Sequence, residues 1–435
     1  MAHPVALALP TVRAPRGLLS PTCLVALTLG LGLALPSPAR AADSIAEVFS
    51  EGTLSGNVRS YFNVRDFDSK PDQGAYALGG VLRGETSPFH GFSIGGAYYV
   101  SDDLGTMNDD ADRVLGTLPA STEILGEAFL RYSHGGSSLT AGRIKIDTPF
   151  ANPSDAFIIP ITFEGIGVES DVIPGVRLEA YYLTRFKNRS ADEFVDVGDF
   201  VGGRLAGLTA ENAADQGTAI VGATWARGKT GVSAFGYWFT DYFATTYVEA
   251  RHELAPLAGV TPYVGAQYVY QFDTGDDLLS RGAGARVAGR EVDGQSMGAL
   301  LGAKLGSFDL SFAYNHVDRS SSSLLGGALL APYSFATSSI FTNSMVDTLE
   351  NSDSGSAYKL TLQSKLGERV VAKLSVASYE RDVLGDSVET DVDVTYAFTG
   401  IVDGLSFRVR LGIVSSSDRD QRVSNLRTQL QYTYR

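Results

Sequence analysis

The sequence predicts an all-β protein, a transmembrane antiparallel β-barrel of about 18 strands with short periplasmic turns and long external loops. Three observations lead to this fold. The chain begins with an export signal, segments of about ten residues alternate between apolar and polar side chains, and short connections between these segments take turns with long ones. Beyond the signal, no apolar run reaches the roughly 20 residues of a membrane helix. We therefore expect strands to cross the membrane.

The export signal is read from the first residues of the chain. Arg13 and Arg16 precede an apolar stretch over residues 18–35, and residues 39–41 (Ala-Arg-Ala) place small side chains at the −3 and −1 positions of a cleavage site. This pattern predicts a signal peptide over residues 1–41.

Residues 42–435 are predicted to form one outer-membrane barrel domain. The single cysteine, Cys23, lies in the signal, and a closed barrel needs no disulfide because its strands satisfy one another's hydrogen bonds. The 48 glycines, 20 tyrosines and 22 phenylalanines suit turns and interfacial aromatic girdles. The formal charge of −14 disfavours a nucleic-acid partner, since phosphate binding needs a basic surface.

Alternation is clearest in the last third of the chain. In residues 358–366, Leu360 and Leu362 alternate with Lys359 and Gln363. Because successive side chains of a strand point to opposite faces, one face is apolar and the other polar. The same pattern recurs in residues 370–376, 390–398, 405–413 and 426–434. A soluble β-sandwich also alternates, but the signal and the loop pattern favour lipid on the apolar face and water on the other.

The long connections are predicted to be external loops. They cover residues 101–123, 147–162, 187–216, 273–290 and the serine-rich stretch 317–354, whose removal we expect to leave conductance largely intact. The acidic cluster Asp102, Asp103, Asp109, Asp110 and Asp112 could bind Ca²⁺ through carboxylate oxygens. It lacks the spacing of an EF-hand loop, so a solvated loop is the favoured interpretation and no metal site is expected. Its negative field would still draw cations to the mouth.

One segment resembles a known family. Residues 141–155 read A-G-R-I-K-I-D-T-P-F-A-N-P-S-D, and Thr162-Phe163-Glu164-Gly165 follows. This run is similar to the corresponding stretch of the OprD family of outer-membrane porins, which reads much like G-R-x-x-x-D-T-P-x-x-N-P-S-D…P…T-F-E-G. The resemblance implies an 18-stranded passive channel, monomeric or homotrimeric and without cofactors, in the lipid and lipopolysaccharide of a Gram-negative outer membrane. One departure is the ending Tyr434-Arg435, where barrels commonly end in an aromatic residue.

The resemblance further implies a third loop that folds into the lumen and faces a basic wall. The residues themselves are compatible, since prolines such as Pro149 stop strand extension and exposed apolar residues on an external loop would be unfavourable. A loop folded over the barrel mouth is the alternative. The expected constriction loop contains Asp147, Pro149, Phe150, Asn152, Asp155, Phe157 and Ile158.

The alternation also predicts a column of basic side chains in the lumen. Such a column would attract carboxylates and bias passive diffusion towards amino acids or small carboxylates. The alternative for each residue is a solvating side chain paired with a neighbouring carboxylate such as Asp393. The predicted solute-binding wall consists of Arg59, Arg131, Arg143, Lys145, Arg177, Lys359, Lys373, Arg408, Arg410 and Arg427.

The charge and the serine-rich loop suggest two alternative functions. The acidic total charge suggests a non-specific, cation-preferring diffusion porin as the main alternative, and the serine-rich loop a surface adhesin as a minor one. An enzyme is not expected, because no G-x-S-x-G elbow or metal-spaced histidine pair is present. We therefore expect no catalytic residues.

Overall fold

The computed structural model describes residues 44–435, with the exception of residues 107–112, 114–117, 119–120, 155–156, 215, 282–289, 334–338 and 418–420. The predicted signal peptide, Asp155 of the expected constriction loop and Asp109, Asp110 and Asp112 of the acidic cluster lie outside the described residues.

The elements follow one another as antiparallel hairpins with a few short helices in the loops. The helical segments are α2 (Ile45–Ser50), α3 (Val197–Ala206), η2 (Ala210–Asn212), η3 (Leu278–Arg281) and η4 (Leu324–Gly327). The strands are β1 (Thr53–Phe67), β2 (Gln73–Glu85), β3 (Phe92–Asp102), β4 (Ser121–His134), β5 (Ser137–Ile144), β6 (Thr162–Ser170), β7 (Val176–Lys187), β8 (Val195–Asp196), β9 (Thr218–Arg227), β10 (Thr230–Phe239), β11 (Phe243–Glu253), β12 (Val260–Asp273), β13 (Asp293–Leu305), β14 (Phe308–Val317), β15 (Gly355–Leu366), β16 (Val370–Arg381), β17 (Ser387–Ala397), β18 (Leu405–Ser416) and β19 (Gln421–Tyr434).

The sheet closes into a barrel because its first and last strands pair. Val58 of β1 lies opposite Tyr432 of β19, and every neighbouring pair of the wall is antiparallel. The sheet has 19 strands in the part of the chain that the structure describes. Two-residue β8 lies in the loop after β7, and β7 pairs directly with β9, which leaves 18 strands in the wall. The predicted fold class is confirmed.

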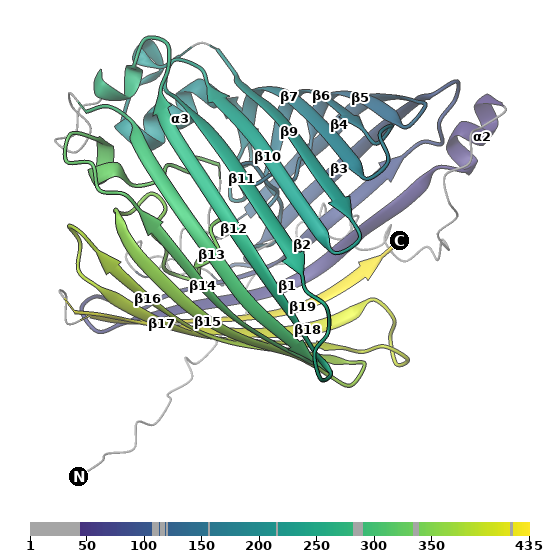
Figure 1. The fold of residues 1–435 in the computed structure, drawn as a ribbon. Helices are drawn as coiled ribbons and strands as arrows, with labels where there is room; N and C mark the ends of the chain where they lie inside the picture. The colour runs from purple at the N-terminus through teal and green to yellow at the C-terminus, as the bar shows by residue number, and fades with distance from the viewer. Residues whose placement is uncertain are drawn as a thin grey trace.

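The two rims of the barrel differ. The short turns, α2 and the end of β19 lie at one rim, and the long loops with α3 lie at the opposite rim (Figure 1). Asp196 caps the first turn of α3 by accepting a hydrogen bond from the backbone N–H of Gly198 at 2.9 Å, as N-cap aspartates commonly do. The short-turn rim is the periplasmic one in barrels of this type.

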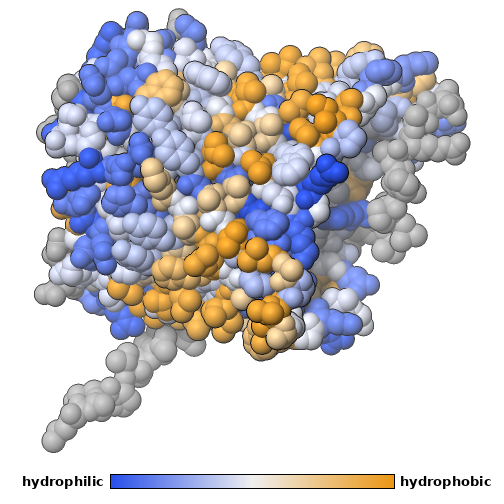
Figure 2. Space-filling model, in the orientation of Figure 1, coloured by the Kyte–Doolittle hydropathy of each residue, from blue (hydrophilic) through white to orange (hydrophobic). Residues whose placement is uncertain are grey.

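The outer face is apolar, as the alternation predicted. On β16, Leu374 and Val376 are exposed on the outer wall, whereas Ser375 between them is buried on the lumen side. Figure 2 shows apolar side chains gathered over the outer wall, and hydrophilic side chains at the long-loop end. No helix among the described residues is long and apolar enough to span a bilayer.

Glycine opposite an aromatic ring fixes one bend of the wall. Gly126 is the extra residue of a β-bulge between β3 and β4, and the buried ring of Tyr99 lies against it. A Cβ on Gly126 would stand 2.1 Å from the Cε2 atom of Tyr99. The ring is also held by its hydroxyl, which donates to Glu127 at 2.7 Å.

We expect Gly126→Ala to lower the free energy of unfolding by about 1–3 kcal/mol, the usual effect of overfilling a packed site. Urea unfolding in detergent or vesicles would measure the change. Gly84→Ala is the matched control, because the nearest atom to its added Cβ is 3.9 Å away. An equal effect of the two substitutions would show that the Tyr99 ring does not matter.

Candidate functional site

The third loop crosses the lumen from one side of the wall to another. Residues 145–161 connect β5 to β6. Near its start, the ring of Phe150 meets Tyr237 edge-on at 5.6 Å, and its backbone N–H donates to the Tyr237 hydroxyl at 3.1 Å. Farther along, the ring of Phe157 lies 6.0 Å from that of Tyr61 on β1. The loop therefore lies inside the barrel and not over its mouth.

The apolar residues of this loop are its attachment points. Phe157 and Ile158 are buried in a cluster with the inward side chains of β1 to β4, and Phe150 is buried among those of β10 and β11. Asn152 is buried and its side chain accepts a hydrogen bond from the backbone N–H of Ser154 at 3.1 Å. Of the other expected constriction residues, Asp147 is exposed and Pro149 is partly exposed.

The loop over residues 318–354 also enters the lumen, so the prediction that it lies outside the barrel is wrong. The side chain of Gln271 on β12 donates to the carbonyl of Leu330 and accepts from its N–H, both at 2.7 Å. The hydroxyl of Tyr379 on β16 donates to the carbonyl of Thr342 at 2.8 Å. Buried apolar residues of this loop, such as Leu330 and Tyr333, do not follow the alternation of a strand. The serine-rich composition of the segment therefore indicated an exposed loop.

The two inward loops meet each other. The hydroxyl of Ser339 donates to the carbonyl of Pro149 in the third loop. Tyr333 is fully buried and its ring lies 5.2 Å from that of Phe163, the residue after the start of β6. The lumen is thus narrowed by a pair of contacting loops.

Wall carboxylates hold the loop over residues 318–354 in place. The two carboxylate oxygens of Glu389 accept hydrogen bonds from the backbone N–H groups of Val346 and Asp347, at 2.8 and 2.7 Å. Asp347 in turn pairs with Arg381 of the wall at 2.5 Å. Charge-assisted hydrogen bonds of this kind are roughly twice as strong as neutral ones.

Four arginines gather where both loops touch the wall, and we call Arg59, Arg189, Arg410 and Arg427 the arginine cluster. Arg427 on β19 lies opposite Arg410 on β18. Its guanidinium donates to the carbonyl of Met345 at 3.2 Å and lies 5.9 Å from the ring of Phe157. Arg427 therefore touches both inward loops.

The guanidinium of Arg427 has a hydrogen-bond donor that meets no acceptor in the described part of the chain. Its Nε donates to Asn425 at 2.6 Å, but its NH1 is buried without a hydrogen-bond partner, and no carboxylate within the described residues forms a salt bridge with it. Arg59 donates to the side chain of Gln431 at 2.9 Å and to the carbonyl of Phe157. Buried donors of this type favour an anionic acceptor.

Arg189 is the member that sequence reasoning missed. It lies in the loop after β7, where its guanidinium is 4.1 Å from the ring of Phe157 and donates to Ser154 at 3.2 Å. Burial lowers the pKa of Arg189 to about 9, and the nearby charges of Arg427 and Arg204 act in the same direction. The side chain is cationic at neutral pH. No sequence signal marks it, because a loop residue has no periodicity to show which way it points.

Five of the ten members of the predicted basic wall pair with carboxylates, and Arg410 of the arginine cluster is one of them. The other five lie beside the inward loops. The paired ones are Arg131 with Glu85 at 2.7 Å, Arg143 with Glu164 at 2.8 Å, Arg177 with Glu169 at 2.7 Å, Arg408 with Asp393 at 2.5 Å and, more loosely, Arg410 with Asp393 at 3.3 Å.

The three lysines of the predicted wall line cavities beside the inward loops. Lys359 and Lys373, together with Arg410, line a cavity of about 220 Å³ behind Ser344 and Met345. Lys359 also donates to the carbonyl of Asn343. This space lies between the wall and the loop over residues 318–354.

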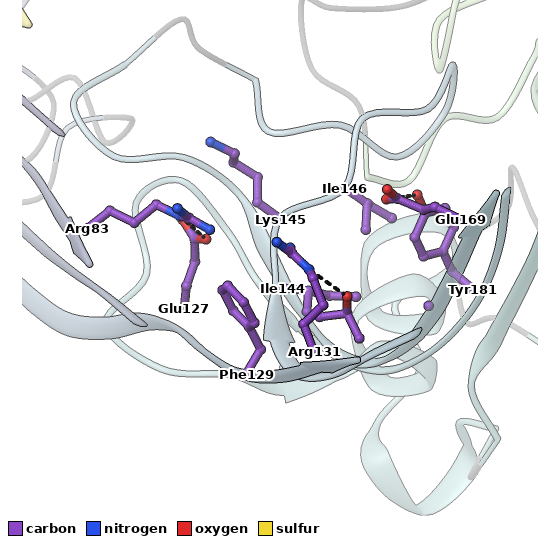
Figure 3. A pocket seen from close by; sticks show the side chains of 11 residues that line it. Arg83, Glu127, Phe129, Arg131, Ile144, Lys145, Ile146, Glu169 and Tyr181 are labelled. Atoms are coloured by element: carbon purple, nitrogen blue, oxygen red, sulfur yellow. Dashed lines mark hydrogen bonds and ion pairs between the residues drawn. The ribbon is translucent and has the colours of Figure 1, made fainter. Parts of the chain in front are cut away.

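A second cavity lies beside the third loop, measures about 330 Å³ and is drawn in Figure 3. Lys145 and Arg131 bring positive charge to it, and Glu127 and Glu169 bring negative charge. Figure 3 shows the Arg83–Glu127 pair and Glu169 on opposite sides of this space, with Lys145 between them. The cavity therefore offers charges of both signs to one small solute.

We expect Asp393→Asn to strengthen anion preference, because it removes the carboxylate that neutralises Arg408 and Arg410. One charge at about 7 Å in water shifts the energy of an anion by about 0.6 kcal/mol and that of a cation by as much in the opposite direction, so the ratio of anion to cation permeability changes by roughly sevenfold. Reversal potentials under a salt gradient measure this ratio. Asp309→Asn is the control, since Asp309 accepts a hydrogen bond from Tyr263 at 2.7 Å near the periplasmic rim. An unchanged ratio in Asp393→Asn would contradict the expectation.

Within the described residues, no group of three or more histidine, cysteine, aspartate or glutamate side chains is placed to hold a metal ion.

Comparisons with known proteins agree on one family and one fold. Residues 123–435 match the family model described as outer membrane porin, OprD family. Among solved structures, the chain is similar to Pseudomonas aeruginosa OccK9 (OpdG), with a TM-score of 0.72 at 18% identity, covering 89% of this chain and 99% of that one. It is also similar to Acinetobacter baumannii OccAB3, with a TM-score of 0.72 at 16% identity over 89% and 100% of the two chains.

A third structure is that of P. aeruginosa OpdK with vanillate, with a TM-score of 0.68 at 16% identity, covering 89% of this chain and 99% of that chain. At these identities the likeness to solved structures concerns the fold. No curated protein matched the sequence.

Proposed function

The chain belongs to the OprD family of outer membrane porins, and from this premise we propose that it is a passive channel biased towards small carboxylates and amino acids. It lies in the outer membrane of Gram-negative bacteria, and its family and fold are those of a channel. The bias is our proposal, and the resemblance allows a homotrimer as well as a monomer.

The observation that carries this proposal is the position of Arg427. Its guanidinium touches the two loops that narrow the lumen, through the carbonyl of Met345 and the ring of Phe157, and keeps one buried N–H group without a partner. Because Arg427 is only 3% exposed, a solute meets this donor when it enters the junction of the two loops. A carboxylate supplies the missing acceptor.

The chemistry of the cluster suits carboxylates in particular. Guanidinium groups bind carboxylates through two parallel hydrogen bonds, which adds geometric selection to charge attraction. Rings of basic side chains in a narrow pore attract anions and repel cations. Vanillate, the ligand in the OpdK structure, is itself an aromatic carboxylate.

A second candidate class, amino-acid zwitterions, is favoured by the cavity beside the third loop. Lys145 would bind the carboxylate, and Glu169, which also pairs with Arg177, would bind the ammonium group, since both line the same space. At roughly 30 Å³ per water molecule, a cavity of about 330 Å³ has room for a small amino acid.

The test uses the mature protein in a planar bilayer, with benzoate, glycine and benzylamine added in turn at equal concentration. The proposal expects saturable block of the current by benzoate, weaker block by glycine and none by benzylamine. Block by benzylamine alone, or passage of all three without saturation, would instead support a non-specific, cation-preferring diffusion porin.

A further inference from the structure

The periplasmic rim exposes apolar side chains where turns are normally polar. Nine large hydrophobic residues are exposed outside the strands in the described part of the chain. Eight of them lie at this rim, and the remaining one, Val383, lies at the long-loop rim. The eight are Ile45, Phe49, Val172, Ile173, Leu254, Leu257, Ile401 and Val402.

These residues come in pairs on four ordered segments. Val172 and Ile173 lie in the turn after β6, where the carbonyl of Ile173 accepts a hydrogen bond from Val176 at 2.9 Å. In the turn after β11, the N–H of Leu257 donates to the carbonyl of Val260 at 2.8 Å. In the turn after β17, the N–H of Ile401 donates to the carbonyl of Phe398 at 2.9 Å.

The fourth pair lies on α2. Ile45 and Phe49 are four residues apart and so share one face of this short helix. The carbonyl of Val48 accepts a hydrogen bond from the N–H of Ser87, in the turn after β2, at 2.9 Å. The helix is thereby fixed to the rim while Ile45 and Phe49 stay 72% and 73% exposed.

The tightest turns of the same rim are different. Residues 135–136, 228–229, 306–307 and 367–369 consist of glycine and polar or charged residues. Three of the apolar pairs therefore belong to longer turns, and the fourth belongs to α2. Apolar exposure of this extent marks a surface that another phase or molecule covers.

The arrangement of the pairs identifies what covers them. They lie beside β1, between β6 and β7, between β11 and β12, and between β17 and β18, and so are distributed around the whole circumference. A partner docking on one side would not reach all four. Lipid surrounds the barrel on every side.

The apolar turns are also continuous with the lipid-facing wall. Val260, whose carbonyl holds the Leu257 turn, lies opposite Leu305 on β13, and Leu305 is 56% exposed on the outer face. We propose that these four segments are interfacial anchors that dip into the periplasmic leaflet of the membrane and set the depth at which the barrel sits. Apolar side chains on amphipathic segments bind membranes in this way, at the boundary between headgroups and acyl chains.

Single-tryptophan variants test the proposal. Trp225 and Trp238 are the two native tryptophans, and both are replaced by phenylalanine. One tryptophan is then introduced by Leu257→Trp, by Ile401→Trp or, as the control at the long-loop rim, by Val383→Trp. Each folded variant is reconstituted in phosphatidylcholine vesicles with or without brominated acyl chains.

We expect bromine to quench the tryptophans of Leu257→Trp and Ile401→Trp at least about twice as strongly as that of Val383→Trp, since quenching requires contact with the acyl region. Acrylamide in the aqueous phase should show the opposite order. Quenching by acrylamide alone in all three variants would overturn the proposal. Protection in native outer membranes but not in vesicles would also overturn it, and would assign the rim to a protein partner.

Discussion

Replacing residues 318–354 by a short turn is expected to raise the single-channel conductance about twofold or more, because this loop fills part of the lumen, which in a barrel of this size is otherwise an aqueous channel. Its residues Leu330 and Thr342 are bonded to the inner wall, and its residue Ser339 bonds the third loop. Removing it takes away one of the two constricting segments. Single-channel recordings in a planar bilayer measure the change.

A milder variant separates loss of the loop from loss of folding. Glu389→Gln leaves the chain length unchanged. It replaces the carboxylate, whose two oxygens accept from the N–H groups of Val346 and Asp347, by an amide with a single acceptor oxygen. It should increase current noise without a large change of mean conductance, because the loop is still attached at Gln271. Heat-modifiable migration on gels verifies that both variants are folded. Unchanged conductance in a folded deletion variant would contradict the inward position of this loop.

The second large effect is expected from the arginine cluster. Arg427→Gln combined with Arg59→Gln should weaken block by benzoate by about 10- to 100-fold, the range that corresponds to the roughly 1.5–3 kcal/mol of a hydrogen bond to a charged group. The anion preference should fall in the same variant, because two buried cations are lost at the narrow part of the lumen. Concentration dependence of block and reversal potentials measure both effects.

Arg177→Gln is the matched control for this experiment. Arg177 is half-exposed near the periplasmic rim and pairs with Glu169 and Asp171, at 2.7 and 3.1 Å. Its loss should leave benzoate block within about twofold of the parent protein, since surface ion pairs contribute little. If the control and the double variant weaken block equally, the arginine cluster has no special role.

The wall of this barrel could be predicted because its physics is local. Side chains two residues apart share a face, so the alternation of Leu360 and Leu362 with Lys359 shows which residues meet lipid. Burial confirms the assignment, since Lys359 faces the lumen while Leu360 is exposed outside. The closure of β1 on β19 then follows from the need to leave no open edge in a membrane.

The site could be predicted only in part, because it depends on contacts between distant segments. Alternation places Arg408 and Arg427 in the lumen alike, but only the strand register shows that Asp393 neutralises the first and that no described carboxylate pairs with the second. Which loops enter the lumen is decided by buried anchors such as Phe150 and Tyr333. Arg189 reaches the cluster from such a loop.

The reversal potential of the unmodified mature channel under a potassium chloride gradient tests the central claim most directly. The claim is that buried arginines at the junction of both loops decide selectivity, although the whole chain carries a formal charge of −14. We predict a reversal potential with the same sign as the equilibrium potential of chloride. In the Arg59→Gln, Arg427→Gln variant this potential should move towards zero. A potential of the sign set by potassium, unchanged in that variant, would contradict the claim.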